Sequence, residues 1–160
     1  MADDFDDVSH QLEKLLRGLK IMKIKDVIEI LKQEGTWVRW NRCTRDCILF
    51  GNENQEVTKI GVCWVATNKV IEKALEKGIN FIISHENIFY TTGTHLETKL
   101  VESIEYKKEL LSKGNICVYR CHDVWDSIPE CGVSDVWAKK LGFDFRNRVI
   151  NSYYQSANIP

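Results

Sequence analysis

The sequence lacks the features that mark membrane and secreted proteins. It contains only two prolines, Pro129 and Pro160, and no apolar run approaches the roughly 18 residues that a membrane-spanning helix requires. Its first residues, MADDFDD, are acidic where a secretory signal would be basic. None of its six cysteines belongs to a C-x-x-C pair. We therefore expect a cytoplasmic protein with free thiols and no membrane partner.

The chain also lacks an excess of basic residues and the loops that common nucleotide enzymes use to hold phosphate. Its 22 Lys and Arg residues against 23 Asp and Glu residues give a net charge of −1, which argues against a nucleic-acid partner. No G-x-x-x-x-G-K-[ST] loop, G-x-G-x-x-G turn or G-x-S-x-G elbow is present. Mechanisms that depend on those motifs have no support here.

One segment interleaves two tryptophans, Trp37 and Trp40, with three arginines in the sequence WVRWNRCTR. Such a pattern can stack bases and hold phosphates. A corner between a helix and a strand, with buried tryptophans and solvated arginines, explains it as well, and we favour this structural interpretation. Cys43 and Cys47 form a C-x₃-C pair without a matching second half, which is a weak signal for zinc.

Residues 1–21 differ from the rest of the chain. An acidic head precedes apolar residues at helical spacing, which are Val8, Leu12, Leu15, Leu16 and Leu19. This pattern predicts either a short docking helix or a leader appended to the domain. Residues 22–160 contain no internal repeat and no Pro/Gly-rich linker, so we expect them to form one domain.

Apolar runs and amphipathic segments alternate along that domain. Helical spacing predicts helices at residues 22–35, 67–78, 96–114 and 132–142, and short apolar runs predict strands at 57–66, 79–84, 115–121 and 145–150. Strands that are apolar throughout, with helices between them, are typical of a parallel sheet that is covered on both sides. We predict an α/β fold with a mostly parallel sheet and helices on both faces.

Two of the predicted strands end in the same way. In NFIISHENIFY an apolar run is followed by His85 and Glu86, and in NICVYRCHDVWD another is followed by His122, Asp123 and Asp126. The carboxyl ends of parallel strands open on one side of a sheet, where ligands bind, so these side chains can meet there if the strands are neighbours.

Histidines and carboxylates at one place match the ligand preferences of zinc, manganese or iron. His95, in the loop after the first junction, could join them, and six donors would suit two divalent ions that share a bridging carboxylate. The alternative is that each histidine at a strand end is a hydrogen-bonded structural residue. The repeated placement favours a metal site.

Four segments of the chain carry a resemblance to a known family. In order and at similar spacing, MKIKDVIEILKQ, DCILFGN, KIGVCWVATNKVIEKALEKGINFIISHE and VYRCHDVWDSIPECGVSDVWAKKLGF resemble the NIF-three-like dinuclear-metal-centre family, whose members are often labelled type 2 GTP cyclohydrolase I homologues. The resemblance covers residues 22–145.

The resemblance implies a ligand set. The family ends one strand with a His-His pair, whose positions fall on His85 and Glu86, and a later H-T-N-L-D segment corresponds to His122 and Asp126. It implies that His85, Glu86 and Asp126 are ligands and that His122 lies in or beside the site. His95 and Asp123 rest on the strand-end argument alone.

This chain departs from the family pattern at several points. Glu86 replaces a neutral imidazole by a carboxylate, which favours harder ions and could bridge two of them. Val65 stands where the family usually has an aspartate. The family draws a further histidine and glutamate from a second half that this sequence does not contain, so the chain is a fragment, a natural short form, or a protein whose shell another chain completes. The resemblance also implies a homo-oligomer, a ring-like hexamer with its metals facing an inner cavity.

These observations predict a divalent-metal-binding protein, with two ions in a dinuclear centre. One hypothesis is a metal-dependent hydrolase of a nucleotide-like or phosphate-bearing small molecule, and a GTP substrate is suggested by the family label only. The alternative is a non-catalytic, metal-stabilised regulatory or scaffold protein that acts through oligomeric assembly.

Overall fold

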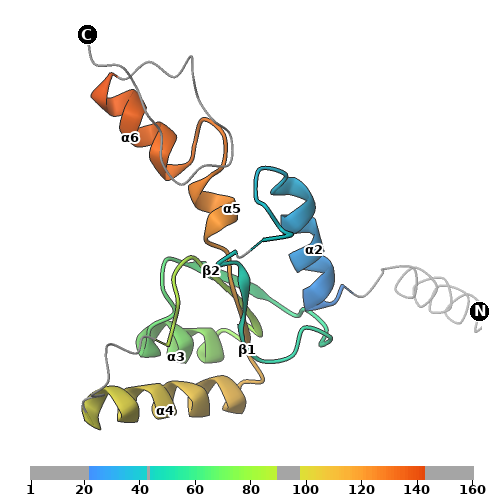
Figure 1. Ribbon diagram of the computed structural model, residues 1–160. Helices are drawn as coiled ribbons and strands as arrows, with labels where there is room; N and C mark the ends of the chain where they lie inside the picture. The colour runs from blue at the N-terminus through green and yellow to red at the C-terminus, as the bar shows by residue number, and fades with distance from the viewer. Residues whose placement is uncertain (1–21, 43, 90–97, 143–160) are drawn as a thin grey trace, which may run out of the picture.

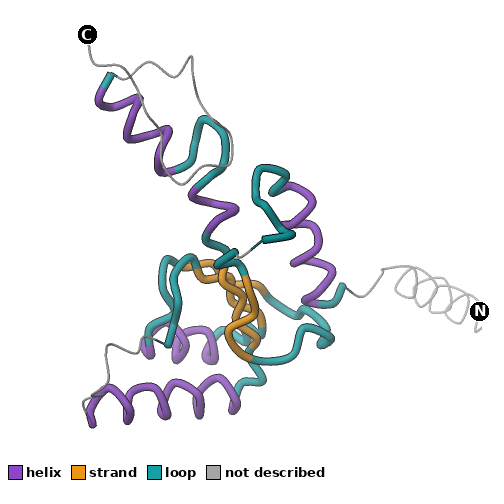
Figure 2. The backbone as a smooth tube through the Cα atoms, viewed as in Figure 1, coloured by secondary structure: helices purple, strands orange, loops and turns teal. Residues whose placement is uncertain are grey.

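The computed structural model describes residues 22–42, 44–89 and 98–142, which form a four-stranded sheet with helices on both faces (Figures 1 and 2). The strand order is β1-β4-β3-β2. The strands are β1 (Cys47–Phe50), β2 (Ile60–Cys63), β3 (Phe81–Ser84) and β4 (Cys117–Arg120). β2, β3 and β4 are parallel, and β1 pairs antiparallel with β4. The predicted α/β class with a mostly parallel sheet is confirmed.

Five helices are present in the described part of the chain. They are α2 (Ile24–Glu34), α3 (Asn68–Glu76), α4 (Thr98–Lys113), α5 (Asp123–Asp126) and α6 (Val133–Leu141). The sequence marks several of their ends. The Thr67 hydroxyl accepts a hydrogen bond from the Val70 amide at 3.3 Å and caps α3. Gly142 adopts φ 74°, a left-handed conformation that glycine reaches without strain, and ends α6.

The two faces of the sheet bury two separate apolar clusters. Ile82 and Val118 lie with Ile71 and Leu111 on the face covered by α3 and α4, while Phe81 and Tyr119 lie with Ile28 on the α2 face. Neighbours along a strand point to opposite faces, so one apolar run supplies both clusters. This double burial explains why the two inner strands, β3 and β4, consist mostly of apolar residues.

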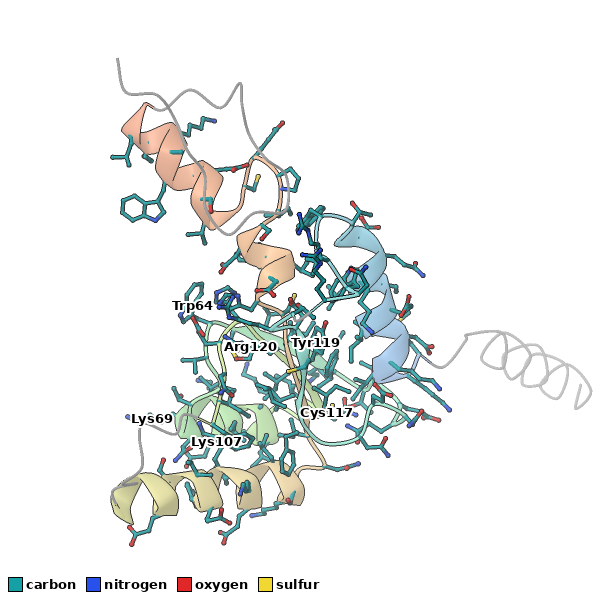
Figure 3. The ribbon with its side chains drawn as sticks, viewed as in Figure 1. Trp64, Lys69, Lys107, Cys117, Tyr119 and Arg120 are labelled. Carbon is teal, nitrogen blue, oxygen red and sulfur yellow. The ribbon has the colours of Figure 1, made fainter. Side chains whose placement is uncertain are left out.

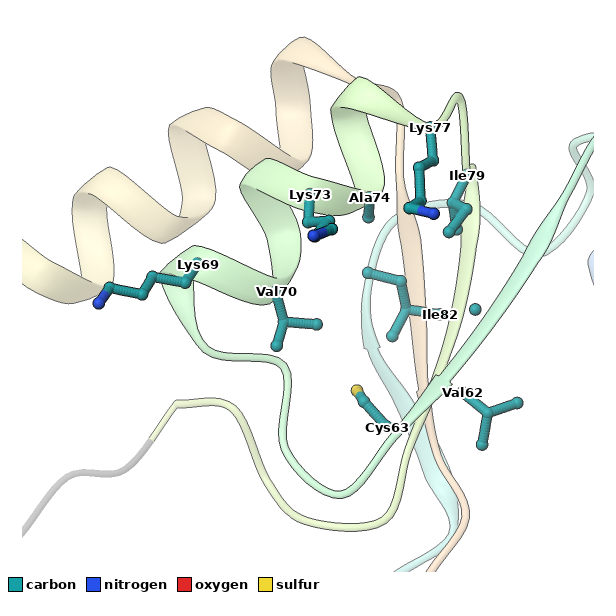
Figure 4. A pocket seen from close by; sticks show the side chains of 10 residues that line it. Val62, Cys63, Lys69, Val70, Lys73, Ala74, Lys77, Ile79 and Ile82 are labelled. Atoms are coloured by element: carbon teal, nitrogen blue, oxygen red, sulfur yellow. The ribbon is translucent and has the colours of Figure 1, made fainter.

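The edge strand β2 is covered on one face only. Figure 4 shows Cys63 and Ile82 pointing toward α3, beside a cavity of about 350 Å³, whereas Val62 points away from that helix. On the α2 side the apolar side chains of β2 and the residue after it stay in solvent: Val62 is 78% exposed and Trp64 59%. α2 therefore leaves this strip of the sheet open.

β1 and α5 are the elements that the sequence analysis did not predict. β1 pairs Cys47 with Arg120 and Ile48 with Tyr119, and a register shift follows Ile48. Because the pairing is antiparallel, the start of β1 lies beside the end of β4. α5 contains only four residues and starts directly after His122. A segment this short shows no helical periodicity from which it could be predicted.

The tryptophan and arginine segment has a structural role. The Trp37 indole donates a hydrogen bond to the Val124 carbonyl at 2.9 Å, and the Trp40 indole donates one to the Gly35 carbonyl at 3.1 Å. Both tryptophans are half-buried, while Arg39 and Arg42 are exposed. The corner between α2 and β1 thus explains the segment, as the structural interpretation predicts.

Other expectations are only partly covered by the described residues. The cysteines that the structure describes, Cys47, Cys63, Cys117, Cys121 and Cys131, are free thiols, as predicted. Cys43, the N-terminal segment 1–21 and the predicted strand 145–150 lie outside the described residues. Within the part of the chain that the structure describes, no helix has the length and apolar character needed to cross a membrane.

Candidate metal centre

His85 and His122 lie at the same edge of the sheet. β3 ends at Ser84 and β4 at Arg120, and these two residues are partners in the parallel register. Backbone hydrogen bonds continue past the strand ends, from the Cys121 amide to the Ser84 carbonyl at 2.9 Å and from the His85 amide to the Cys63 carbonyl at 3.1 Å. The extended pairing fixes both histidine backbones, and the two strand-end junctions meet as the sequence predicts.

Three of the predicted residues form a group that could hold a metal ion. One donor atom from each of His85, His122 and Asp126 lies within 4.8 Å of the other two. The Asp126 carboxylate contacts both imidazoles, with His85 Nε2 3.4 Å from its Oδ1 and His122 Nδ1 3.3 Å from its Oδ2. His122 and Asp126 are one helical turn apart, so α5 brings the carboxylate back over the ring.

The imidazole rings belong to an aromatic stack. The His85 and His122 rings have centroids 4.6 Å apart and planes 13° apart, and the Trp64 indole stacks on His85 at 4.0 Å. His85 is 8% exposed. Figure 3 shows Trp64 and Arg120 at the end of the sheet that faces α5. Stacking restricts the ring planes and so preorganises the nitrogen donors.

Asp46, which the sequence analysis missed, fixes the start of α5. Its Oδ1 accepts the His122 amide at 2.7 Å, and its Oδ2 accepts the Asp123 amide at 2.9 Å and the Thr44 hydroxyl at 2.9 Å. Burial raises the pKa of Asp46, and these hydrogen bonds partly offset that effect. The only available signal was the Thr-x-Asp pattern in front of β1.

Asp123 is a buried partner of His122 and lies outside the three-residue group. Its Oδ2 accepts the Arg45 amide at 2.8 Å and lies 2.9 Å from the Thr44 hydroxyl, whose single hydrogen Asp46 and Asp123 share, and its Oδ1 lies 3.1 Å from His122 Nδ1. Burial alone would raise the pKa of Asp123, but the Arg45 amide, the Thr44 hydroxyl and His122 outweigh it and lower that pKa. The hydrogen bond to Asp123 requires a proton on Nδ1, the same nitrogen that faces Asp126, so a metal bound at that nitrogen would replace this hydrogen bond.

Glu86 also lies outside that group. The Glu86 carboxylate is 3.3 Å from the Arg120 guanidinium, whose Nε donates a hydrogen bond to the His85 carbonyl at 3.4 Å. Arg120 therefore ties Glu86 to the backbone of the neighbouring histidine. His95 falls outside the described residues.

The chemistry of the three donors fits a divalent ion. Two imidazoles and one carboxylate form a ligand set used for zinc and for non-haem iron. Bonds of about 2.0–2.1 Å place tetrahedral donors about 3.4 Å apart, which agrees with the separations of 3.3 and 3.4 Å to the Asp126 oxygens. Asp126 Oδ1, the oxygen that faces His85 Nε2, is buried and makes no hydrogen bond to the described residues, so it can still accept a ligand bond.

Comparison with known proteins places these features in a family. A GTP cyclohydrolase 1 type 2 homolog of Clostridium perfringens is 27% identical over 129 residues, which are 77% of this chain and 46% of that protein. A protein with the same name from Staphylococcus aureus is 30% identical over 121 residues, which are 76% of this chain and 32% of that protein. The chain thus spans less than half the length of these relatives.

Solved structures agree in fold. The crystal structure of Staphylococcus aureus protein SA1388 has a TM-score of 0.59 at 27% identity, over 79% of this chain and 35% of that one. Reduced HcgD from Methanocaldococcus jannaschii has a TM-score of 0.59 at 22% identity, over 77% of this chain and 48% of that one, and shows likeness of fold alone. The model of the Duf34/NIF3 (NGG1p interacting factor 3) family matches residues 22–156, and the chain belongs to that family.

Proposed function

We propose that this protein binds divalent metal through His85, His122 and Asp126. The observation that carries the proposal is the convergence of the three donor atoms within 4.8 Å at the carboxyl ends of two parallel strands. Neutral imidazoles and a carboxylate suit zinc, manganese or iron. The buried Asp126 Oδ1, which lacks a hydrogen bond to the described residues, supports the same conclusion.

We extend the proposal to two ions that share the Asp126 carboxylate. Each imidazole faces a different oxygen of that carboxylate, which is the arrangement that a bridging ligand requires. Glu86 directly follows His85 in the sequence, and its carboxylate is the one that we assign to a second set of donors. The stoichiometry of bound metal separates one ion from two.

The proposed reaction is hydrolysis of a nucleotide-like or phosphate-bearing small molecule. Divalent ions at such a site supply Lewis-acid chemistry and the activation of water. Among the chain's own residues, Thr44 and Arg45 hold Asp123 beside His122, and Arg120 holds Glu86 in place. We assign proton transfer to Glu86 at a site with one ion, because Asp123 already accepts hydrogen bonds and has a lowered pKa; at a site with two ions Glu86 is a ligand instead.

Elemental analysis of protein purified without added metal tests the binding site. We expect metal in the wild type and its loss in His85→Ala and in Asp126→Ala. Glu105→Ala serves as the matched control, because Glu105 forms an exposed pair with Lys108 on α4. Circular dichroism confirms that each variant is folded. Unchanged metal content in both site variants would refute the proposal.

A turnover screen with GTP and generic phosphoesters, with and without manganese, tests the reaction. Activity that requires metal and disappears in Asp126→Ala supports a hydrolase. If the metal-loaded protein is inactive on every substrate, the metal-stabilised scaffold is the better description. Mass measurement in solution tests the homo-oligomer that we expect in either case.

A further inference from the structure

An apolar pocket lies directly beside the proposed metal ligands. It has a volume of about 290 Å³, and its lining includes Trp64, His85, Cys121 and Trp125. That volume lies at the small end of the range for ligand pockets. His85 belongs both to this pocket and to the proposed metal site, so a molecule in the pocket would touch the site.

Two indoles border the pocket and remain largely in solvent. Trp64 follows the edge strand β2 and is 59% exposed, and Trp125 lies on α5 and is 57% exposed. Large aromatic side chains next to a site, rather than in the core, are the residues that most often bind a ring. The two tryptophans come from different elements of the fold, and both border the same pocket.

The geometry for ring stacking is already present. Trp64, His85 and His122 form a column in which successive ring centroids are 4.0 and 4.6 Å apart. One face of Trp64 packs on His85, and the residue remains 59% exposed. A planar ring in the pocket would lie against Trp64 and Trp125, beside His85.

The remaining lining is uncharged. Apart from His85, it is made by Val62, Ile83, the two thiols Cys63 and Cys121, and the indoles. Such a lining disfavours a sugar, whose hydroxyls would lose hydrogen bonds on burial, and disfavours free phosphate. It suits a flat, poorly hydrated ring.

We propose that this pocket binds a planar aromatic ring and thereby places the rest of the substrate at the His85, His122 and Asp126 group. The inference deepens the proposed function, on which its second half rests. Trp64 and Trp125 are then the residues that determine specificity for the ring. Ring binding itself requires no metal.

Equilibrium dialysis tests the proposal with guanosine and adenosine as ring probes and ribose 5-phosphate as the probe without a ring. We expect the wild type to retain the nucleosides in the presence of EDTA and not to retain ribose 5-phosphate. Trp64→Leu and Trp125→Leu should each weaken retention by about fivefold or more, the usual effect of losing one aromatic stack. Trp64→Phe should restore much of it.

Trp137→Leu is the matched control, because Trp137 is 65% exposed on α6 and does not line the pocket. Its nucleoside binding should equal that of the wild type. Equal weakening in Trp137→Leu, or no nucleoside retention by the wild type, overturns the proposal. A change of mass in solution on Trp64→Leu, without nucleoside binding, also overturns it and identifies the surface as a contact between copies.

The same samples separate this inference from the metal proposal. Metal content is measured alongside dialysis. Metal binding without nucleoside retention refutes the ring pocket and leaves the metal proposal intact. Nucleoside retention without metal refutes the metal proposal and leaves the ring pocket.

Discussion

Replacement of Asp46 by alanine should destabilise the domain and weaken metal binding together. The carboxylate accepts hydrogen bonds from two backbone amides, those of His122 and Asp123, at 2.7 and 2.9 Å. Asp46 is only 7% exposed. Alanine would leave both amides without a partner in a place that water reaches poorly. An unsatisfied buried group costs about 1–3 kcal/mol, so we expect a loss of about 2–4 kcal/mol in the free energy of unfolding.

Urea denaturation measures this loss as a lower midpoint with an unchanged m-value. At about 2–4 °C per kcal/mol for a chain of this size, the melting temperature should fall by roughly 5–15 °C. Because α5 carries Asp126, the affinity for zinc or manganese, measured by calorimetry on the folded variant, should fall by about 10–100-fold, as for other residues that support ligands.

Glu105→Ala provides the comparison, since an exposed pair of this kind contributes less than about 1 kcal/mol. Asp46→Asn is the sharper variant. Its amide retains one acceptor oxygen but presents an N–H group to the second backbone amide, so it should lose most of the stability that alanine loses. Our reasoning is refuted if Asp46→Ala unfolds at the same urea concentration as Glu105→Ala and binds metal as the wild type does.

Four further outcomes are expected. Manganese or zinc at 100 times its dissociation constant should stabilise the wild type by about 2.7 kcal/mol and leave His122→Ala unchanged in thermal melts. Burial raises the pKa of the Cys117 thiol to about 11 from an ordinary value of 9.0, so the unfolded chain loses this proton first and stability falls by about 1.4 kcal/mol per pH unit between those values. Urea melts at pH 8 and pH 10 should show that loss in the wild type and a smaller one in Cys117→Ala. Ile82→Ala, at a residue 1% exposed, should cost about 2–4 kcal/mol, and Val62→Ala, at 78% exposed, less than about 0.5 in the same melts. Gly51→Ala should reduce the yield of folded protein and lower its midpoint, because Gly51 has φ 90° and an added Cβ would lie 2.7 Å from the Cys117 Cα.

The sequence contains enough information to predict the parallel part of the fold. Continuous apolar runs such as residues 81–83 arise because both faces of β3 are buried, and the Thr67 cap and Gly142 stop mark helix ends by local chemistry. These signals act within a few residues, so they can be read without knowing the fold. The same rule that places strand ends at one edge predicted the meeting of His85 and His122.

The elements that depend on distant contacts could not be predicted in the same way. β1 is an edge strand whose side chains are only partly buried. It pairs antiparallel with β4, which lies about seventy residues further along the sequence. Asp46 is recognisable as a functional support only once that pairing places it under His122. The separate fates of Asp123, Glu86 and Asp126 are likewise decided by which donors lie nearby: Thr44 and Arg45 for Asp123, and Arg120 for Glu86.

The dependence of the site on β1 follows from the length of α5. A helix of four residues forms too few internal hydrogen bonds to be stable by itself, so its position is set by external contacts. Asp46 holds the amides at its start, and the Trp37 indole holds the Val124 carbonyl within it. Both contacts come from the segment between α2 and β1, whereas His85 is fixed by the parallel strands. Metal affinity should therefore be more sensitive to substitutions around residues 37–46 than to equally destabilising ones under α3 and α4.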